Sequence, residues 1–279
     1  MDSAVQWPGS SAASADAAVQ ESSPVDAVVF EHSATVLTYN VAGLPQGVSG
    51  SDPLFNTSQM SPLLNQYDLV VVQEDFSYHD QLIAEAEHPY QSSPQAGGVG
   101  VADGLNRFSM HPFQGHERIE WADCSGYLDG SNDCLAKKGF SVATHSIEGV
   151  LVDVYNLHMD AGRSAKDHDA RAAQVAQMVR RIHDHSSGRP LIVAGDTNLK
   201  DAADEAILAE LMQTAQLFDV CRTLDCPDPD RIDRVFVRGN SDVEIVPEAW
   251  TTDERFVDWQ GEPLSDHEAV GVRLSIRSR

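Results

Sequence analysis

The sequence predicts one large domain of the mixed α/β or α+β class, with strands and helices alternating around packed sheets. Residues 68–74 and 190–196 are continuous apolar runs, which are typical of strands buried on both faces. Residues 140–147 and 150–159 are two strand-like runs joined by Glu148-Gly149, which indicates a hairpin. Residues 167–185 repeat apolar side chains at intervals of three and four, as a helix with one buried face does.

The remaining elements follow in chain order. Residues 1–33 are rich in Ala, Ser, Gln and Asp without any Lys or Arg, and predict a flexible leader before a single domain over residues 34–279. Further strands are expected over 35–41, 231–239, 243–250 and 269–276, and further helices over 58–67, 77–86 and 203–215.

Composition excludes some classes of protein. No stretch of the 279 residues approaches the roughly 20 consecutive apolar residues of a membrane-spanning helix. Nineteen Lys and Arg stand against 43 Asp and Glu, a formal net charge of −24. Such a charge repels polyanions, which argues against a sequence-independent DNA-binding module. It does not exclude a nuclease that approaches phosphate through metal ions.

The four cysteines form two pairs that are close in sequence. Cys124 and Cys134 lie in a polar stretch, and Cys221 and Cys226 bracket another, without His or Cys at zinc-ligand spacing. We expect the disulfides Cys124–Cys134 and Cys221–Cys226, and with them an oxidising compartment, with free thiols in a cytosolic protein as the alternative. The protein is therefore expected to be secreted or periplasmic, with its signal peptide already removed.

Polar side chains end or begin six strand-like segments. One such residue is usually a cap or a turn former, but six segments with the same feature indicate a cluster. Buried carboxylates require a cation or hydrogen-bond donors, and Glu, Asp and Asn oxygens suit a hard divalent ion such as Mg²⁺ or Ca²⁺. The residues are Asn40, Glu74, Asn156, His158, Asp196, Asn198, Asp233, Asp266 and His267.

The motifs around these residues resemble those of the endonuclease/exonuclease/phosphatase superfamily, which includes deoxyribonuclease-like and sphingomyelinase-like metal-dependent phosphohydrolases. The resemblance implies a four-layer sandwich with two mixed, mainly antiparallel β-sheets face to face and helices outside. It also implies a divalent-metal-dependent phosphodiesterase. The matching elements are YNVAG (39–43), VVVQE (70–74), YNLHMDAG (155–162), VAGDTN (193–198), RIDRVFV (231–237) and LSDHEAV (264–270).

The resemblance also implies a metal site. Glu74 is similar to the carboxylate that holds the essential metal, with Asn40 beside it, and Asp266 is similar to a further carboxylate on the metal side. We expect Mg²⁺, with Mn²⁺ or Ca²⁺ as alternatives.

Five residues match the family's catalytic positions. Asp196 and Asn198 are similar to the pair that orients the attacking water and binds the phosphoryl oxygens. His158 is similar to the histidine that hydrogen-bonds the scissile phosphate. His267 is similar to the general base or phosphate-binding histidine, oriented by Asp233. These roles agree with the needs of the reaction, which are charge neutralisation at phosphorus and a polarised water.

The substrate is less well defined by the sequence. Residues 124–140, with Lys137-Lys138-Gly139-Phe140, resemble the sphingomyelinase-like branch, and the net charge suits a zwitterionic phospholipid better than a polyanion. We therefore expect a secreted sphingomyelinase-like phosphodiesterase that acts as a monomer without a stable protein partner. A secreted nonspecific nuclease is the first alternative, and a catalytically inactive binding module is the remote one.

The other histidines are expected to have no catalytic role. His145 alternates within a strand and is expected to be structural. Histidines in polar loops or helix flanks are expected to be solvated, namely His79, His88, His111 and His116. His168, His183 and His185 lie on the polar face of the 167–185 helix, where a regulatory metal is the minor alternative.

Overall fold

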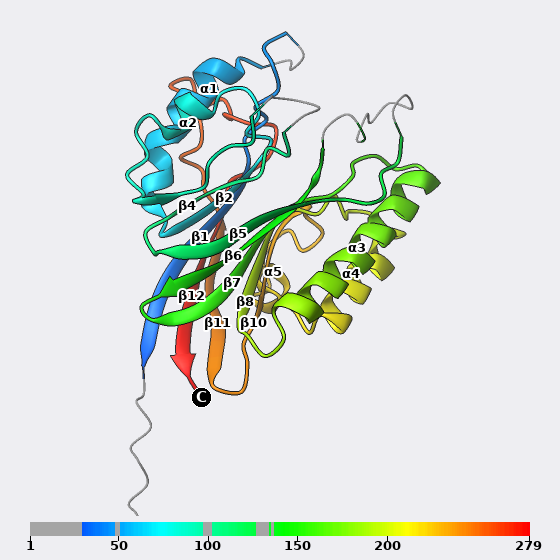
Figure 1. Cartoon of the computed structure of the whole chain (residues 1–279). Helices are drawn as coiled ribbons and strands as arrows, with labels where there is room; N and C mark the ends of the chain where they lie inside the picture. The colour runs from blue at the N-terminus through cyan, green and yellow to red at the C-terminus, as the bar shows by residue number, and fades with distance from the viewer. Residues whose placement is uncertain (1–29, 48–50, 97–101, 127–133, 135–136) are drawn as a thin grey trace, which may run out of the picture.

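Two six-stranded β-sheets face each other, and helices cover the outer surface of each sheet (Figure 1). The computed structural model describes residues 30–47, 51–96, 102–126, 134 and 137–279. This is the four-layer sandwich that the sequence predicts.

The first sheet has the strand order β11-β12-β1-β2-β4-β3. Strands β1 and β2 are parallel, whereas β12 pairs antiparallel with both β1 and β11. Its strands are β1 (Glu31–Asn40), β2 (Leu69–Gln73), β3 (Tyr90–Gln91), β4 (Asn106–Ser109), β11 (Val243–Thr252) and β12 (Val270–Ser278).

The second sheet has the order β5-β6-β7-β8-β10-β9, with β7 and β8 parallel. The predicted hairpin is β6–β7, and both turn residues, Glu148 and Gly149, have positive φ values of 49° and 90°, as a two-residue turn between twisted strands requires. Its strands are β5 (Phe113–Glu120), β6 (Gly139–Ile147), β7 (Val150–His158), β8 (Leu191–Asp196), β9 (Phe218–Asp219) and β10 (Asp233–Arg238).

The helices divide between the two outer faces (Figure 1). Helices α1 (Pro53–Met60), η1 (Ser61–Gln66) and α2 (His79–Ile83) cover the first sheet. Helices α3 (Ala165–His185) and α4 (Asp204–Thr214) lie side by side on the second sheet, and the short α5 (Val220–Thr223) precedes β10.

Three clusters of buried apolar residues bind these layers together. One lies between the sheets and joins side chains such as Val36 and Val71 of the first sheet to Val154 and Ile192 of the second. The second cluster joins α3 and α4 to the outer face of their sheet, and the third does the same for α1, η1 and α2. Burial of these faces is the main favourable contribution to the fold.

The sequence-based expectations differ from the structure at several boundaries. The leader was expected to extend to residue 33, but β1 begins at Glu31 because its pairing with β12 extends beyond the apolar run, from Glu31 opposite Arg277. Residues 1–29 of that leader lie outside the described residues. The helix expected over 58–67 is two helices, α1 and η1, with Pro62 at the start of η1. Helix α2 is shorter than the expected 77–86.

Both predicted disulfides are present. Cys124 is bonded to Cys134 and Cys221 to Cys226, with Cα–Cα distances of 5.5 and 5.0 Å. Among the helices of the described ranges, none is both long enough and apolar enough to cross a membrane.

Candidate active site

The predicted polar residues gather at one end of the sandwich because of the strand directions. Asn40 ends β1 and Glu74 follows β2, which is parallel to β1. His158 and Asp196 end the parallel strands β7 and β8. Strands β10 and β12 are antiparallel to their neighbours, so residues at or just before their starts lie at this same end, Asp233 among them.

Three of these residues are adjacent across the second sheet. Asp196 is the register partner of His158 on one side and of Asp233 on the other. Gly195 allows β8 to lie this close to β7, because a Cβ there would lie 2.0 Å from the carbonyl oxygen of Leu157, and its φ is +146°. The glycine of the GD-x-N motif is therefore required by backbone packing.

Asn40 and Glu74 bring the first sheet into the site. Asn40 Nδ2 lies 3.1 Å from Glu74 Oε1 and 3.3 Å from Asp196 Oδ2, so one amide contacts carboxylates of both sheets. Asn40 Oδ1 accepts from the backbone N–H of Ala42, which fixes the orientation of the amide. Glu74 has a left-handed backbone with φ of 58°, a conformation that is uncommon outside glycine and recurs at functional sites.

His267 and Asp233 form a close pair. His267 Nδ1 lies 2.8 Å from Asp233 Oδ2, and Nε2 lies 3.4 Å from Asn40 Nδ2 and 3.8 Å from Asp196 Oδ2. Burial lowers the pKa of His267, but the hydrogen bond to Asp233 and the charges of Asp233, Asp196 and Asp266 outweigh it and raise the pKa to about 9. The imidazole is therefore a cation at neutral pH.

His158 is buried and faces the same carboxylates. Its Nε2 lies 3.5 Å from Asp196 Oδ2 and 3.8 Å from Glu74 Oε1. Burial, with the charges of Lys138 and His267, holds the pKa of His158 well below its usual range, so this ring is neutral. Burial, followed by the charge of Asp233, raises the pKa of Asp196 to about 6.

Asn198 lies in the loop after β8, also with a left-handed backbone, φ 52°. Its backbone N–H donates to Asp196 Oδ1 at 2.9 Å, and its Nδ2 donates to the carbonyl oxygen of Met159 at 3.0 Å. The same carbonyl accepts from Lys138 Nζ at 3.2 Å. Lys138 is thus a cation at the edge of the site, although by sequence it is only part of a stretch that resembles the sphingomyelinase-like branch.

Asp266 lies at the rim of the site and is exposed. Asp266 Oδ1 lies 3.4 Å from Ser265 Oγ, and that hydroxyl donates to the carbonyl oxygen of Asn40 at 2.7 Å. Asp196, Asp233 and His267 are close enough to share one ion, and Asp266 is not part of that group. The predicted metal-side role of Asp266 therefore stays a prediction.

The donor set fits a hard divalent cation. Glu74 and Asp196 converge on the single amide of Asn40, and Asp233 Oδ1 is buried without a hydrogen-bond donor. Clustered carboxylates with few donors between them suit an oxygen-preferring ion such as Mg²⁺. Glu74 would hold it, because its side chain is still 21% exposed. Asn40 presents its Nδ2 to the carboxylates and its Oδ1 to the N–H of Ala42, so its predicted role as a metal ligand stays a prediction.

Other polar residues lie away from this cluster. Asn156 is buried between the sheets, where Gln73 Nε2 donates to its Oδ1 at 2.7 Å, so it joins the two sheets below the site. His145 is buried, as expected. His79 and His88 are not solvated as expected, since His79 pairs with Asp75 and His88 is buried against the carbonyl oxygen of Tyr67. His116 also differs from the expectation, because its Nε2 is buried and this burial lowers the pKa of the ring to about 3.

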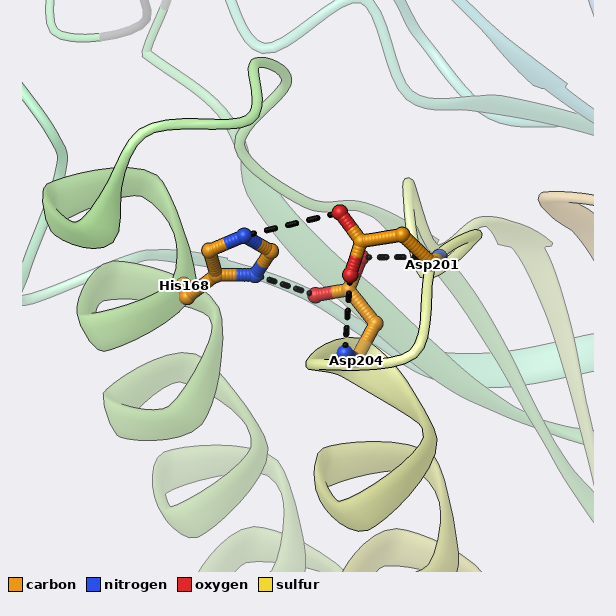
Figure 2. A group of neighbouring side chains, drawn as sticks. All are labelled: His168, Asp201 and Asp204. Atoms are coloured by element: carbon orange, nitrogen blue, oxygen red, sulfur yellow. Dashed lines mark hydrogen bonds and ion pairs between the residues drawn. The ribbon is translucent and has the colours of Figure 1, made fainter.

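His168, Asp201 and Asp204 form a second group of potential ligands, shown in Figure 2. A cation already contacts it, because Arg171 Nη2 lies 2.9 Å from Asp204 Oδ1 and 3.0 Å from His168 Nδ1. The regulatory-metal alternative for His168 therefore receives no support from this geometry.

Comparison with known proteins places this site in context. A model of the Endonuclease/Exonuclease/phosphatase family matches residues 37–267. A sphingomyelinase of Mycobacterium tuberculosis is 32% identical over 273 residues, which cover 89% of this chain and 54% of the relative. The chain thus spans about half the length of that relative.

Two solved structures share the fold at lower sequence identity. TDP2 of D. rerio, complexed with a single-strand DNA product, has a TM-score of 0.68 and 17% identity over 87% of this chain and 98% of its own. A beta toxin of Staphylococcus aureus with bound magnesium ions has a TM-score of 0.61 and 14% identity over 89% of this chain and 100% of its own.

Proposed function

Because the chain belongs to the endonuclease/exonuclease/phosphatase family, we propose that it is a divalent-metal-dependent phosphodiesterase that hydrolyses a phospholipid of the sphingomyelin type. The observation that carries this proposal is the meeting of Glu74 and Asp196 on the amide of Asn40, with His158 and His267 around them. The carboxylates of Glu74 and Asp196, the neutral ring of His158 and the imidazolium of His267 therefore lie close together.

The chemistry follows from the protonation states. Asp196, with its pKa of about 6, is ionised at neutral pH and accepts the proton of the attacking water. The water oxygen bonds to phosphorus as the bond from phosphorus to the lipid alcohol oxygen breaks, and that oxygen takes up a proton from solvent. His267, with its pKa of about 9, donates a hydrogen bond to a non-bridging phosphoryl oxygen, and Asp233 holds its other ring nitrogen. A bound divalent ion supplies further neutralisation of phosphoryl charge.

The remaining residues bind and orient the phosphate. His158 is neutral and buried, so it can donate a hydrogen bond to phosphate without placing a second positive charge beside His267. Lys138 adds a positive charge at the edge of the site.

Three observations support a lipid rather than a nucleic acid as substrate. The relative that matches at 32% identity is a sphingomyelinase. The charge of −24 repels polyanions more than it repels a zwitterionic headgroup. Trp259 is 82% exposed at the tip of the segment that leads to His267, where Val257 pairs with Pro263. An exposed aromatic side chain suits contact with a membrane interface.

We also propose that the protein acts outside the cytoplasm as a monomer. The disulfides Cys124–Cys134 and Cys221–Cys226 support an oxidising compartment.

Side-by-side assays test the proposed substrate. Release of product is measured from sphingomyelin vesicles, lysophospholipid and duplex DNA, each with Mg²⁺ and with a chelator, and with His267→Ala as the inactive control. We expect Mg²⁺-dependent release of phosphocholine from sphingomyelin. Cleavage of DNA in preference to both lipids would establish the nuclease alternative, and no turnover of any diester would favour the binding module.

A further inference from the structure

Arg171 of α3 is completely buried and contacts two separate segments of the chain. Its Nη1 donates to the carbonyl oxygens of Asp160, Ala161 and Gly162, at 3.0, 3.3 and 3.0 Å. Its Nε and Nη2 lie 3.0 and 2.9 Å from Asp204 Oδ1. A buried guanidinium with this many contacts fixes the groups that it touches, because its N–H donors would otherwise be buried and unpaired.

The first of these segments, residues 159–162, continues directly from His158. The carbonyl oxygen of Met159 accepts a hydrogen bond from Asn198 Nδ2. The backbone N–H of Met159 donates to the carbonyl oxygen of Asp196 at 2.9 Å. Three adjacent carbonyls held by Arg171 therefore determine where the chain leaves the site after His158.

The second segment connects Asn198 to α4. Asp204 is the first residue of α4 and is buried, and its Oδ2 accepts from the backbone N–H groups of Lys200 and Asp201, at 3.1 and 3.4 Å. Burial raises the pKa of Asp204, but the hydrogen bonds from Lys200, His168 and Arg171 outweigh it and lower the pKa. Asp204 is thus a charged anchor for the turn that follows Asn198.

His168 covers the open side of this pair. Its Nδ1 lies 2.9 Å from Asp204 Oδ1, and its Nε2 lies 3.5 Å from Asp201 Oδ2 (Figure 2). His168 thus lies against both acidic residues of the turn after Asn198.

We propose that Arg171, through Asp204, is a positioning residue that sets the separation of His158 and Asn198 in the site. The inference rests on the proposed function, because it assigns Arg171 to the same reaction. Arginine is required for this task, since its planar fork reaches three carbonyls and a carboxylate at once, whereas the single ammonium of lysine cannot.

The test compares Arg171→Lys with a matched variant, Arg238→Lys. Arg238 also donates to three backbone carbonyls, those of Ala215, Ser186 and Arg189, but it lies at the far ends of α3 and α4. Turnover and KM are measured with bis(p-nitrophenyl) phosphate, a soluble diester that needs no membrane, together with melting temperature and the NMR resonances of the His158 ring.

We expect Arg171→Lys to lower kcat by about 10- to 100-fold with little change in KM, because small displacements of positioned groups cost rates of that order. The His158 resonances should shift in Arg171→Lys, whereas Arg238→Lys should lose thermal stability alone. Equal kcat in the two variants at equal melting temperatures would overturn the proposal.

A second variant, Asp204→Asn, covers the case in which Arg171→Lys does not fold. It keeps the side-chain shape and removes the charge that Arg171 contacts, and we expect the same loss of kcat to a smaller extent. Unfolding of both variants, with Arg238→Lys folded, would also overturn the proposal, since the pair would then serve the fold alone. If the native protein cleaves no diester, the proposed function fails, and the His158 resonances still decide the positioning role.

Discussion

His267 Nδ1 lies 2.8 Å from Asp233 Oδ2, although the two residues belong to opposite sheets. Asp233 starts β10 of the second sheet, and His267 lies in the loop three residues before Val270, the first residue of β12 in the first sheet. The pair that we assign to phosphate binding is therefore assembled across the sandwich.

His267→Ala is expected to lower turnover by about 10²–10³-fold, as loss of one hydrogen-bond donor to an oxygen that gains charge in the transition state typically does. The backbone stays held because its N–H donates to Ser265 Oγ, so the melting temperature should hardly change. Turnover of the soluble diester at saturating Mg²⁺ measures the effect. His183→Ala, which changes an 85% exposed ring on α3, is the control. Turnover in His267→Ala within twofold of native would leave this histidine without a catalytic role.

Asp233→Asn is expected to lower the pKa of His267 from about 9, because Asp233 contributes both the hydrogen bond and the largest raising charge. Ring NMR of His267 as a function of pH, on metal-free protein, reads this directly. We expect a smaller loss of turnover than in His267→Ala, since the ring remains in place. An unchanged pKa would contradict the coupling between the two side chains.

Glu74→Gln is expected to weaken Mg²⁺ binding by about 10²-fold or more, because even neighbours of metal ligands contribute 10–100-fold to affinity. Shape and packing are preserved, so the fold should persist. Calorimetric titration with Mg²⁺ measures the affinity. Glu244→Gln, which removes the exposed partner of Arg277, should leave it unchanged. A Mg²⁺ affinity in Glu74→Gln equal to that of the native protein would show that Glu74 does not bind the metal.

Trp259→Ala is expected to reduce turnover on sphingomyelin vesicles by about tenfold, since burial of a large apolar side chain contributes ~1.5–3 kcal/mol. Turnover of the soluble diester should not change. Phe218→Ala provides a matched control, because Phe218 is also exposed, at 63%, but lies in β9 at the edge of the second sheet. Equal losses on vesicles and on the soluble diester would show an effect on the site and not on the membrane.

Acid is expected to destabilise the fold. Burial, together with the charge of Arg107, lowers the pKa of His116 to about 3 and that of His145 well below 6.5, and burial holds the pKa of His158 well below its usual range. Below about pH 6.5 the unfolded chain takes up protons that these rings do not, so the free energy of unfolding falls as the pH falls.

If the unfolded chain binds three more protons than the folded protein, the free energy of unfolding changes by up to about 4 kcal/mol per pH unit. Urea unfolding at pH 5 to 8 measures this slope, and His145→Gln should reduce it by about one proton. A free energy of unfolding that is constant from pH 5 to 7 would show that the three rings are protonated in the folded state.

Most strands of the sandwich could be predicted because their sequences are apolar. Residues 69–73 and 191–196 are buried on both faces and read as strands without ambiguity. Strand β4, in contrast, has the sequence NRFS and is fully buried. Its polar groups are satisfied across the sandwich, as when Arg107 donates to the carbonyl oxygen of Val154 and to Ser141 Oγ. The local sequence around Arg107 gives no indication of hydrogen-bond partners that are distant in the chain.

The site residues could be predicted where a carboxylate, amide or imidazole side chain lies at the end of a strand. Asn40, Glu74, His158, Asp196, Asp233 and His267 meet as the motifs imply. Lys138 and Arg171 were not assigned roles, because a lysine in a loop and an arginine within an amphipathic helix are ordinary surface residues by pattern. Only the tertiary structure places Lys138 at Met159 and buries Arg171.

Because the site residues come from both sheets, catalytic activity requires that both sheets have folded and packed against each other. Neither sheet alone contains both His267 and Asp233, or both Asn40 and Asp196. A partly folded chain with a single ordered sheet would therefore turn over nothing, because the phosphate-binding pair and the two carboxylates around Asn40 would be incomplete. Recovery of activity after dilution from urea should therefore lag behind recovery of strand content and coincide with burial of the apolar layer between the sheets. The protein would then be inactive until its two sheets have packed against each other.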